Sequence, residues 1–177
     1  ADSRANPPDL ENFIREYPDV DLLLGDFDHE LFVSARLLII SPGVNPNHPA
    51  IMNAVSNGVE LIGDIELFAR HVNAPVVAVT GSNGKSTVAS LISSMINAAG
   101  LNVYLGGNFG TPALCLLEKN SPDFYVLELS SFQLETVSSL NAVAAVVLNI
   151  SADHMDRYQG LDDYANAKQR IYAGNGS

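Results

Sequence analysis

Residues 80–87 carry the pattern Thr-Gly-Ser-Asn-Gly-Lys-Ser-Thr, which combines groups suited to holding a nucleotide phosphate. Gly81 and Gly84 allow backbone angles that turn N–H groups inward around phosphate oxygens. Lys85 can reach the outer phosphates, and the hydroxyl of Ser86 is placed to bind the accompanying Mg²⁺. We therefore expect nucleotide phosphates to be bound by Gly81, Ser82, Asn83, Gly84, Lys85, Ser86 and Thr87.

The loop lies between an apolar run over 76–80 and an amphipathic segment that begins near Lys85, which is the context that a phosphate loop requires. The usual pattern, Gly-x-x-x-x-Gly-Lys-Ser/Thr, would place its first glycine at position 79, where this chain has Val79. A glycine-rich turn capped by serine would explain the glycines without a ligand. It would not explain Lys85 at a helix N-terminus, where a positive charge is unfavourable unless an anion is bound.

Two further polar residues follow apolar runs. Glu128 follows the run over 125–127, and a carboxylate there is costly to desolvate unless it meets a cation, so Glu128 is a candidate Mg²⁺ ligand. The alternative is a carboxylate that pairs with a lysine or caps the next helix. His154, beside Asp153, follows the run over 146–150 and is a candidate for binding metal or substrate. A lone histidine is more often a packed or surface residue.

Ligands of an open parallel sheet bind beyond the carboxyl ends of its strands. Asn108 lies in the glycine-rich segment 106–110, just after a predicted strand that ends near Leu105. Its amide offers both a donor and an acceptor to a ligand. Taken alone, this segment is equally consistent with a plain connecting loop.

Short β-rich runs alternate with helical segments along the chain. Runs rich in valine, leucine and alanine on both faces predict an α/β fold of mostly parallel sheets with helices on both faces. The predicted strands are 36–40, 59–62, 76–80, 102–105, 124–129 and 142–150, and the predicted helices are 48–57, a segment capped by Asp64, 85–99, 112–119 and 133–140.

Composition narrows the possible partners. With 47% apolar and 16% charged residues among 177, the chain is expected to fold around a core rather than be disordered. A net charge of −11 argues against nucleic acid and anionic membranes as partners, and no apolar run approaches the roughly 20 residues of a membrane span. The single cysteine, Cys115, is predicted to be a buried thiol in a reducing compartment. These features predict a soluble cytoplasmic protein.

These motifs together resemble the Mur ligase family, which builds the peptide stem of bacterial peptidoglycan. The ATP loop of that family lacks the first glycine of the usual pattern, which accounts for Val79. Segments 128–135 (Glu-Leu-Ser-Ser-Phe-Gln-Leu-Glu) and 149–158 (Asn-Ile-Ser-Ala-Asp-His-Met-Asp-Arg-Tyr) are most similar to members that add D-glutamate. The resemblance extends from Asp2 to about Tyr172.

The resemblance implies a partial N-terminal Rossmann-like domain for the UDP substrate over residues 1–72. It also implies a partial central P-loop ATPase domain over 73–177, with the C-terminal domain absent. The chain opens without an initiator methionine and closes just after a predicted helix, which we interpret as part of a larger protein. We expect such a part to be inactive alone.

The family also implies an ATP-dependent ligase that joins UDP-N-acetylmuramoyl-L-alanine to D-glutamate through an acyl phosphate. Its cofactors would be ATP and two Mg²⁺ ions, and the protein is expected to be a monomer. By resemblance, the substrate-binding residues are Asp2, Ser3, Arg4, Ser41, Asn108, Ser130 and His154. The implied catalytic residues are Lys85, His154 and Lys168. The metal ligands would be Ser86 and Glu128 for one ion, and His154 with carbamylated Lys168 for the other.

Taken alone, Lys168 is expected to be a surface lysine of a helix, so its role rests on the resemblance. Two alternative functions remain. One is another ligase of the superfamily, such as a folylpolyglutamate synthase, with a different acceptor. The other is a non-catalytic module that binds nucleotide or UDP substrate.

Overall fold

The computed structural model describes residues 1–118, 120 and 122–174. Contacts divide the chain into two compact units. The first comprises Ala1–Leu38 with Asn45–Leu61, and the second comprises Ile39–Val44 with Ile62–Ser177. The predicted phosphate loop and both strand-end segments with candidate metal ligands belong to the second unit.

The first unit is mainly helical. Its helices are α1 (Leu10–Glu16), α2 (His29–Ser34) and α3 (Pro49–Ser56), of which α2 and α3 pack together. The side chain of Asp28 caps α2 by accepting hydrogen bonds from the N–H groups of Glu30 and Leu31. Helix α3 confirms the helix predicted over 48–57, whereas α1 and α2 were not predicted. Strands β1 (Leu37–Ile40) and β2 (Glu60–Gly63) form a two-stranded sheet, and neither strand lies wholly within the first unit.

A four-stranded parallel sheet is the centre of the second unit. Its strands are β3 (Val76–Thr80), β4 (Val103–Gly107), β5 (Phe124–Glu128) and β6 (Ala144–Val147), and their order is β4-β5-β3-β6. Because all four run parallel, their carboxyl ends share one edge of the sheet. The phosphate loop, Asn108, Glu128 and the segment leading to His154 therefore all begin at this edge, as the sequence predicts.

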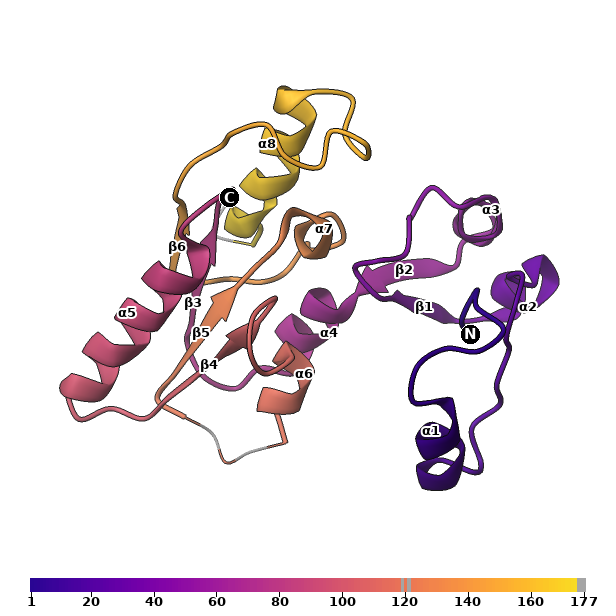
Figure 1. Cartoon of the computed structure of the whole chain (residues 1–177), viewed down its shortest axis with the longest axis horizontal. Coiled ribbons are helices and arrows are strands. Elements are labelled where there is room, and N and C mark those ends of the chain that lie inside the picture. The colour runs from indigo at the N-terminus through magenta and orange to yellow at the C-terminus, as the bar shows by residue number, and fades with distance from the viewer. Residues whose placement is uncertain (119, 121, 175–177) are drawn as a thin grey trace. The chain divides into compact units, whose positions relative to one another are not determined.

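Helices cover both faces of this sheet (Figure 1). Side chains alternate along β3: Val76 and Ala78 join one core cluster, whereas Val79 joins another on the opposite face. Residues of α5 pack into the second cluster, and residues of α4 and α6 pack into the first. This arrangement confirms the predicted α/β fold class. The helices of the unit are α4 (Asp64–His71), α5 (Lys85–Ala98), α6 (Ala113–Leu116), α7 (Ser131–Leu134), α8 (Leu161–Gln169) and a 3₁₀ turn at Arg170–Tyr172.

Several local predictions differ from the structure. Cys115 is exposed, not buried, because Ala113 and Leu116 of the short helix α6 face the core and Cys115 lies between them on the outer side. The helix predicted over 112–119 has only four residues, and Lys119 lies outside the described residues. Asp64 is the first residue of α4, and Gly63 is its N-cap. Within the described residues, no helix is long and apolar enough to cross a bilayer.

Candidate functional site

The phosphate loop connects the end of β3 to the first turn of α5. Gly81 has φ +153°, and a Cβ there would lie 3.1 Å from the Cβ of Leu148 and 3.3 Å from the amide nitrogen of Asn149. Gly84, with φ +81°, is the N-cap of α5. Both positions thus need glycine for backbone geometry. Helix α5 starts at Lys85 as predicted, and the first amides of a helix lack intrahelical acceptors, so they can bind an anion.

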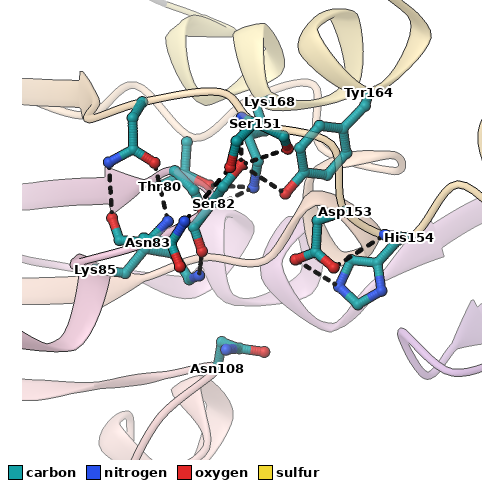
Figure 2. A network of polar contacts seen from close by, with 12 residues as sticks. Thr80, Ser82, Asn83, Lys85, Asn108, Ser151, Asp153, His154, Tyr164 and Lys168 are labelled. Atoms are coloured by element: carbon teal, nitrogen blue, oxygen red, sulfur yellow. Dashed lines mark hydrogen bonds and ion pairs between the residues drawn. The ribbon is translucent and has the colours of Figure 1, made fainter. Parts of the chain in front are cut away.

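Residues after β6 hold this loop in place (Figure 2). The amides of Ser82 and Asn83 donate to the backbone carbonyl and the side-chain oxygen of Asn149, at 3.0 and 2.9 Å. The side-chain amide of Asn149 donates to the Asn83 carbonyl at 2.9 Å. The Ser82 hydroxyl donates to the Ser151 carbonyl and accepts from the Ser151 amide, both at 3.0 Å. The loop is therefore shaped by residues more than 60 positions away in sequence.

A second set of contacts joins the loop to the end of β5. The Ser86 hydroxyl donates to Oε2 of Glu128 at 2.6 Å, and the Asn108 side-chain amide donates to Oε1 at 2.9 Å. Glu128 is only 3% exposed, and no ion pair joins it to a lysine, arginine or histidine of the described chain. It does not cap α7 either, because Ser130 does so. A buried carboxylate held by neutral donors favours a cation beside it.

Lys168 of α8 is buried beneath the same loop, not exposed as expected from the helix alone. Its Nζ donates to the Gly81 carbonyl at 3.0 Å and lies 4.6 Å from the centre of the Tyr164 ring. Burial, and then the nearby charge of Lys85, lower the pKa of the Lys168 amine to about 8, although Asp153 opposes this shift. Lys85 itself donates to the Ser82 carbonyl at 3.1 Å.

His154 lies in the loop after β6, on the same side of Figure 2 as Asp153. Its side chain is 46% exposed, and its Nε2 is 3.6 Å from a carboxylate oxygen of Asp153. Its ring centre is 6.5 Å from that of Tyr164. The structure therefore brings His154 and Lys168 to the same tyrosine, but not into direct contact. The described residues contain no group of three or more His, Cys, Asp or Glu side chains arranged to hold a metal.

The remaining predicted residues occupy different places. Ser130 accepts a hydrogen bond from the Gln133 amide at 3.1 Å, so its hydroxyl caps α7. Ser41 lines a shallow surface depression that Gln133 and Arg157 also line. Asp2, Ser3 and Arg4 belong to the first unit, where Arg4 forms an ion pair with Asp2 at 2.7 Å.

The sequence did not identify Asn149, Ser151 or Tyr164 as parts of the site. Asn149 carries a weak signal, because it is a polar residue at the end of an apolar strand. Tyr164 carries none, since an aromatic residue in a helix usually indicates packing. Its hydroxyl lies 3.3 Å from Oγ of Ser82, a contact between residues 82 positions apart.

Comparison with known proteins gives two family matches. Residues 79–177 match the Mur ligase middle domain, and residues 1–63 match the N-terminal domain described as Mur ligase, MurD-like. One solved structure, a UDP-N-acetylmuramate:L-alanyl-gamma-D-glutamyl-meso-diaminopimelate ligase from Neisseria meningitides, aligns with 96% of this chain and 58% of its own. Its TM-score is 0.56 at 18% sequence identity, which supports the fold alone.

Sequence relatives are closer. The chain is 58% identical over 176 residues to the UDP-N-acetylmuramoylalanine--D-glutamate ligase of Nitrosococcus oceani. It is 55% identical over 174 residues to the protein of the same name from Marinobacter nauticus. These alignments cover 99% and 98% of this chain but only 39% of each relative. The chain thus spans about two fifths of the length of these relatives.

Proposed function

The chain belongs to the Mur ligase family, and we propose that the whole protein is an ATP-dependent ligase that adds D-glutamate to UDP-N-acetylmuramoyl-L-alanine. Relatives with more than half of their aligned residues identical carry the name of such a ligase, which supports this acceptor and amino acid. The proposal includes a role in peptidoglycan precursor synthesis, as a monomer in the cytoplasm. It also assigns residues 1–72 to the UDP-substrate domain and 73–177 to the ATP-binding domain.

The observation that carries the proposal is the hydrogen bond between Ser86 and Glu128 beside Lys85. A serine hydroxyl and a carboxylate are hard oxygen ligands of the kind that Mg²⁺ prefers. Glu128 lacks a cationic partner within the described chain, and the first turn of α5 supplies amides for phosphate oxygens. These features fit a Mg²⁺·ATP site, in which Ser86 and Glu128 would hold the ion and Lys85 would face the outer phosphates.

In the proposed reaction, the carboxylate of UDP-N-acetylmuramoyl-L-alanine attacks the γ-phosphate of ATP, giving an acyl phosphate and ADP. The amine of D-glutamate then attacks the acyl carbon, and phosphate leaves from the tetrahedral intermediate as the amide forms. Magnesium, when bound, would neutralise phosphate charge. Lys85 would stabilise the negative charge on the transferred group, and the loop glycines would let backbone amides approach it. Asn108 would keep the Glu128 carboxylate oriented.

We also propose that Lys168 is carbamylated and, together with His154, holds a second Mg²⁺. A carbamate forms when a neutral amine takes up CO₂, and a pKa lowered to about 8 increases the neutral fraction. In the structure, Nζ of Lys168 donates to the Gly81 carbonyl, which places the amine beneath the loop. Short carboxylic acids should restore activity to Lys168→Ala if a carbamate supplies the missing carboxylate. Failure of such rescue would count against this role.

The principal test is Lys85→Ala in the full-length protein. We expect at least about a 10²-fold loss in the rate of amide formation, because transition-state charge stabilisation is lost. The thermal unfolding temperature should be nearly unchanged, because Lys85 donates one hydrogen bond to the Ser82 carbonyl, and water can replace it. Near-normal turnover of this variant would contradict the proposed site.

A separate experiment identifies the acceptor substrate. It measures which compound causes the protein to release ADP from ATP. UDP-N-acetylmuramoyl-L-alanine should do so together with D-glutamate, whereas a folate should not. ADP release with folate alone would favour a folylpolyglutamate-type ligase. Binding of nucleotide without release under either condition would favour a non-catalytic module.

A further inference from the structure

His154 lies in a tight turn after β6, and contacts from other elements are needed to hold this turn in place. His154 has a left-handed backbone with φ +56°, which is uncommon for a residue other than glycine. Its carbonyl accepts hydrogen bonds from the amides of Arg157 and Tyr158, at 3.0 and 3.2 Å, so these three residues form one tight turn. The imidazole is nearly half exposed. The position of the ring therefore depends on what holds the turn.

Glu135, the C-cap residue of α7, holds this turn. Its Oε1 accepts from Nε of Arg157 at 3.2 Å and from the hydroxyl of Tyr158 at 2.7 Å. The Nη2 of Arg157 donates to the other carboxylate oxygen, which makes the ion pair bidentate. The side chains of Glu135 and Arg157 are only 16% and 17% exposed, so the pair is well shielded from water.

An aromatic contact joins the same helix to the imidazole itself. The Phe132 ring lies 4.7 Å from the His154 ring, centre to centre. The guanidinium carbon of Arg157 lies 4.5 Å from the centre of the same Phe132 ring. Phe132, Glu135, Arg157 and Tyr158 thus form one group, called the Glu135 cluster below, in which α7 contacts both the turn and the ring of His154.

The location of α7 gives this cluster its significance. Helix α7 starts three residues after Glu128, at the end of β5, whereas the His154 turn follows β6. Strands β5 and β6 lie on opposite sides of β3, so they share no backbone hydrogen bonds. We propose that Glu135 is a positioning residue that fixes the His154 imidazole relative to the Glu128 end of the site. This inference rests on the proposed function, which gives His154 its role.

The test is Glu135→Gln in the full-length protein. Glutamine keeps a carbonyl oxygen for Tyr158 but loses the bidentate ion pair and directs an NH₂ group at Arg157. We expect kcat to fall at least about 10-fold, because small displacements of a reacting group are costly. The KM for ATP should change less than about 2-fold, because Asn149 and Ser151, not Glu135, hold the phosphate loop.

Arg157→Lys provides a second variant should Glu135→Gln fold poorly. It keeps the positive charge but loses the forked geometry, so it should lower kcat with the same unchanged KM for ATP. Glu66→Gln is the matched control, because Glu66 also binds an arginine and a hydroxyl within this unit, but away from His154. It should lower thermal stability and leave kcat of the folded protein unchanged.

His154→Ala separates this inference from the proposed function. Loss of activity in His154→Ala, with no further loss on adding Glu135→Gln, supports positioning through His154. Full activity in His154→Ala contradicts the proposed role of the histidine itself. Loss in His154→Ala with normal kcat in Glu135→Gln and Arg157→Lys overturns the positioning role alone. A rise in the KM for ATP without a fall in kcat overturns it as well.

Discussion

Glu66 and Glu128 are two glutamates of one compact unit, 1% and 3% exposed, yet their surroundings differ sharply. The carboxylate of Glu66 accepts from the amides of Ser138 and Ser139, at 2.8 and 3.0 Å, and from the Ser139 hydroxyl at 2.8 Å. It also pairs with Arg70 at 3.2 Å. Among the described residues, the carboxylate of Glu128 accepts from two neutral side chains, the hydroxyl of Ser86 and the amide of Asn108.

The difference separates a carboxylate whose charge is met inside the protein from one that we propose binds a cation. Burial acts to raise the pKa of Glu66, but its hydrogen bonds outweigh burial and lower that pKa to about 2. Its charge is compensated inside the protein, where it fixes the segment leading to β6. The charge of Glu128 is not compensated in this way within the described chain. An unpaired buried charge costs stability, and the proposed Mg²⁺ beside Glu128 would offset that cost.

Replacing Glu128 by glutamine should produce the larger functional effect. Glutamine can still bond to Ser86 and Asn108, but it removes the negative charge that would attract Mg²⁺. We expect at least about a 10²-fold loss of turnover, with a free energy of unfolding that is unchanged or higher. Steady-state kinetics and thermal unfolding of the full-length variant would measure both. If Glu128→Gln stayed active but unfolded more easily, Glu128 would have the structural role that we assign to Glu66.

Glu66→Gln should show the opposite profile. The substitution disrupts a buried ion pair and leaves at least one amide or hydroxyl donor poorly satisfied, so we expect a loss of about 3 kcal/mol in the free energy of unfolding. The kcat of the folded protein should stay within about 2-fold of normal. Denaturant titration and kinetics at a temperature where both proteins are folded would measure these effects. If Glu66→Gln lost activity while it was fully folded, Glu66 would belong to the proposed active site instead.

The contribution of Glu66 should also depend on pH in a defined direction. Its pKa is about 2 in the folded protein and 4.5 as the unperturbed value, so the unfolded chain takes up a proton first as the pH falls. The stabilisation is complete above about pH 4.5 and is lost progressively as the pH falls toward 2. The stability difference between the parent protein and Glu66→Gln should therefore narrow over this range. A constant difference would contradict the assigned pKa shift.

Local sequence patterns singled out Glu128 but not Glu66. The positions of the 80–87 loop and of Glu128 were predictable, because a strand, glycines and a lysine stand next to each other in sequence and because parallel strands end at one edge. Glu66 was not singled out, because its partners Ser138 and Ser139 are more than 70 positions away in sequence. No local pattern encodes such a pairing.

The same reason explains the error in helix α7. The helix predicted over 133–140 is observed at Ser131–Leu134, because Ser130 and Gln133 form a capping box that starts it earlier. The amides of Ser138 and Ser139 bind Glu66 instead of continuing the helix. Long-range hydrogen bonds to Glu66, rather than helical ones, therefore bind the amides of this part of the predicted segment.

The smallest predicted effect concerns Ser82 and Ser151, which support the phosphate loop. It tests whether their contacts shape the surroundings of Glu128. Ser82→Ala removes the hydroxyl that binds both the amide and the carbonyl of Ser151, so the KM for ATP should rise about 5-fold, the equivalent of one net hydrogen bond. Ser151→Ala should change it less than about 2-fold, because the hydroxyl of Ser151 makes only a 3.4 Å contact with Asn83 and its main bonds run through the backbone. Parallel ATP titrations of the two variants measure the difference. Equal effects would mean that the backbone bonds of Ser151 do not hold the loop, and that the environment of Glu128 is shaped by other contacts.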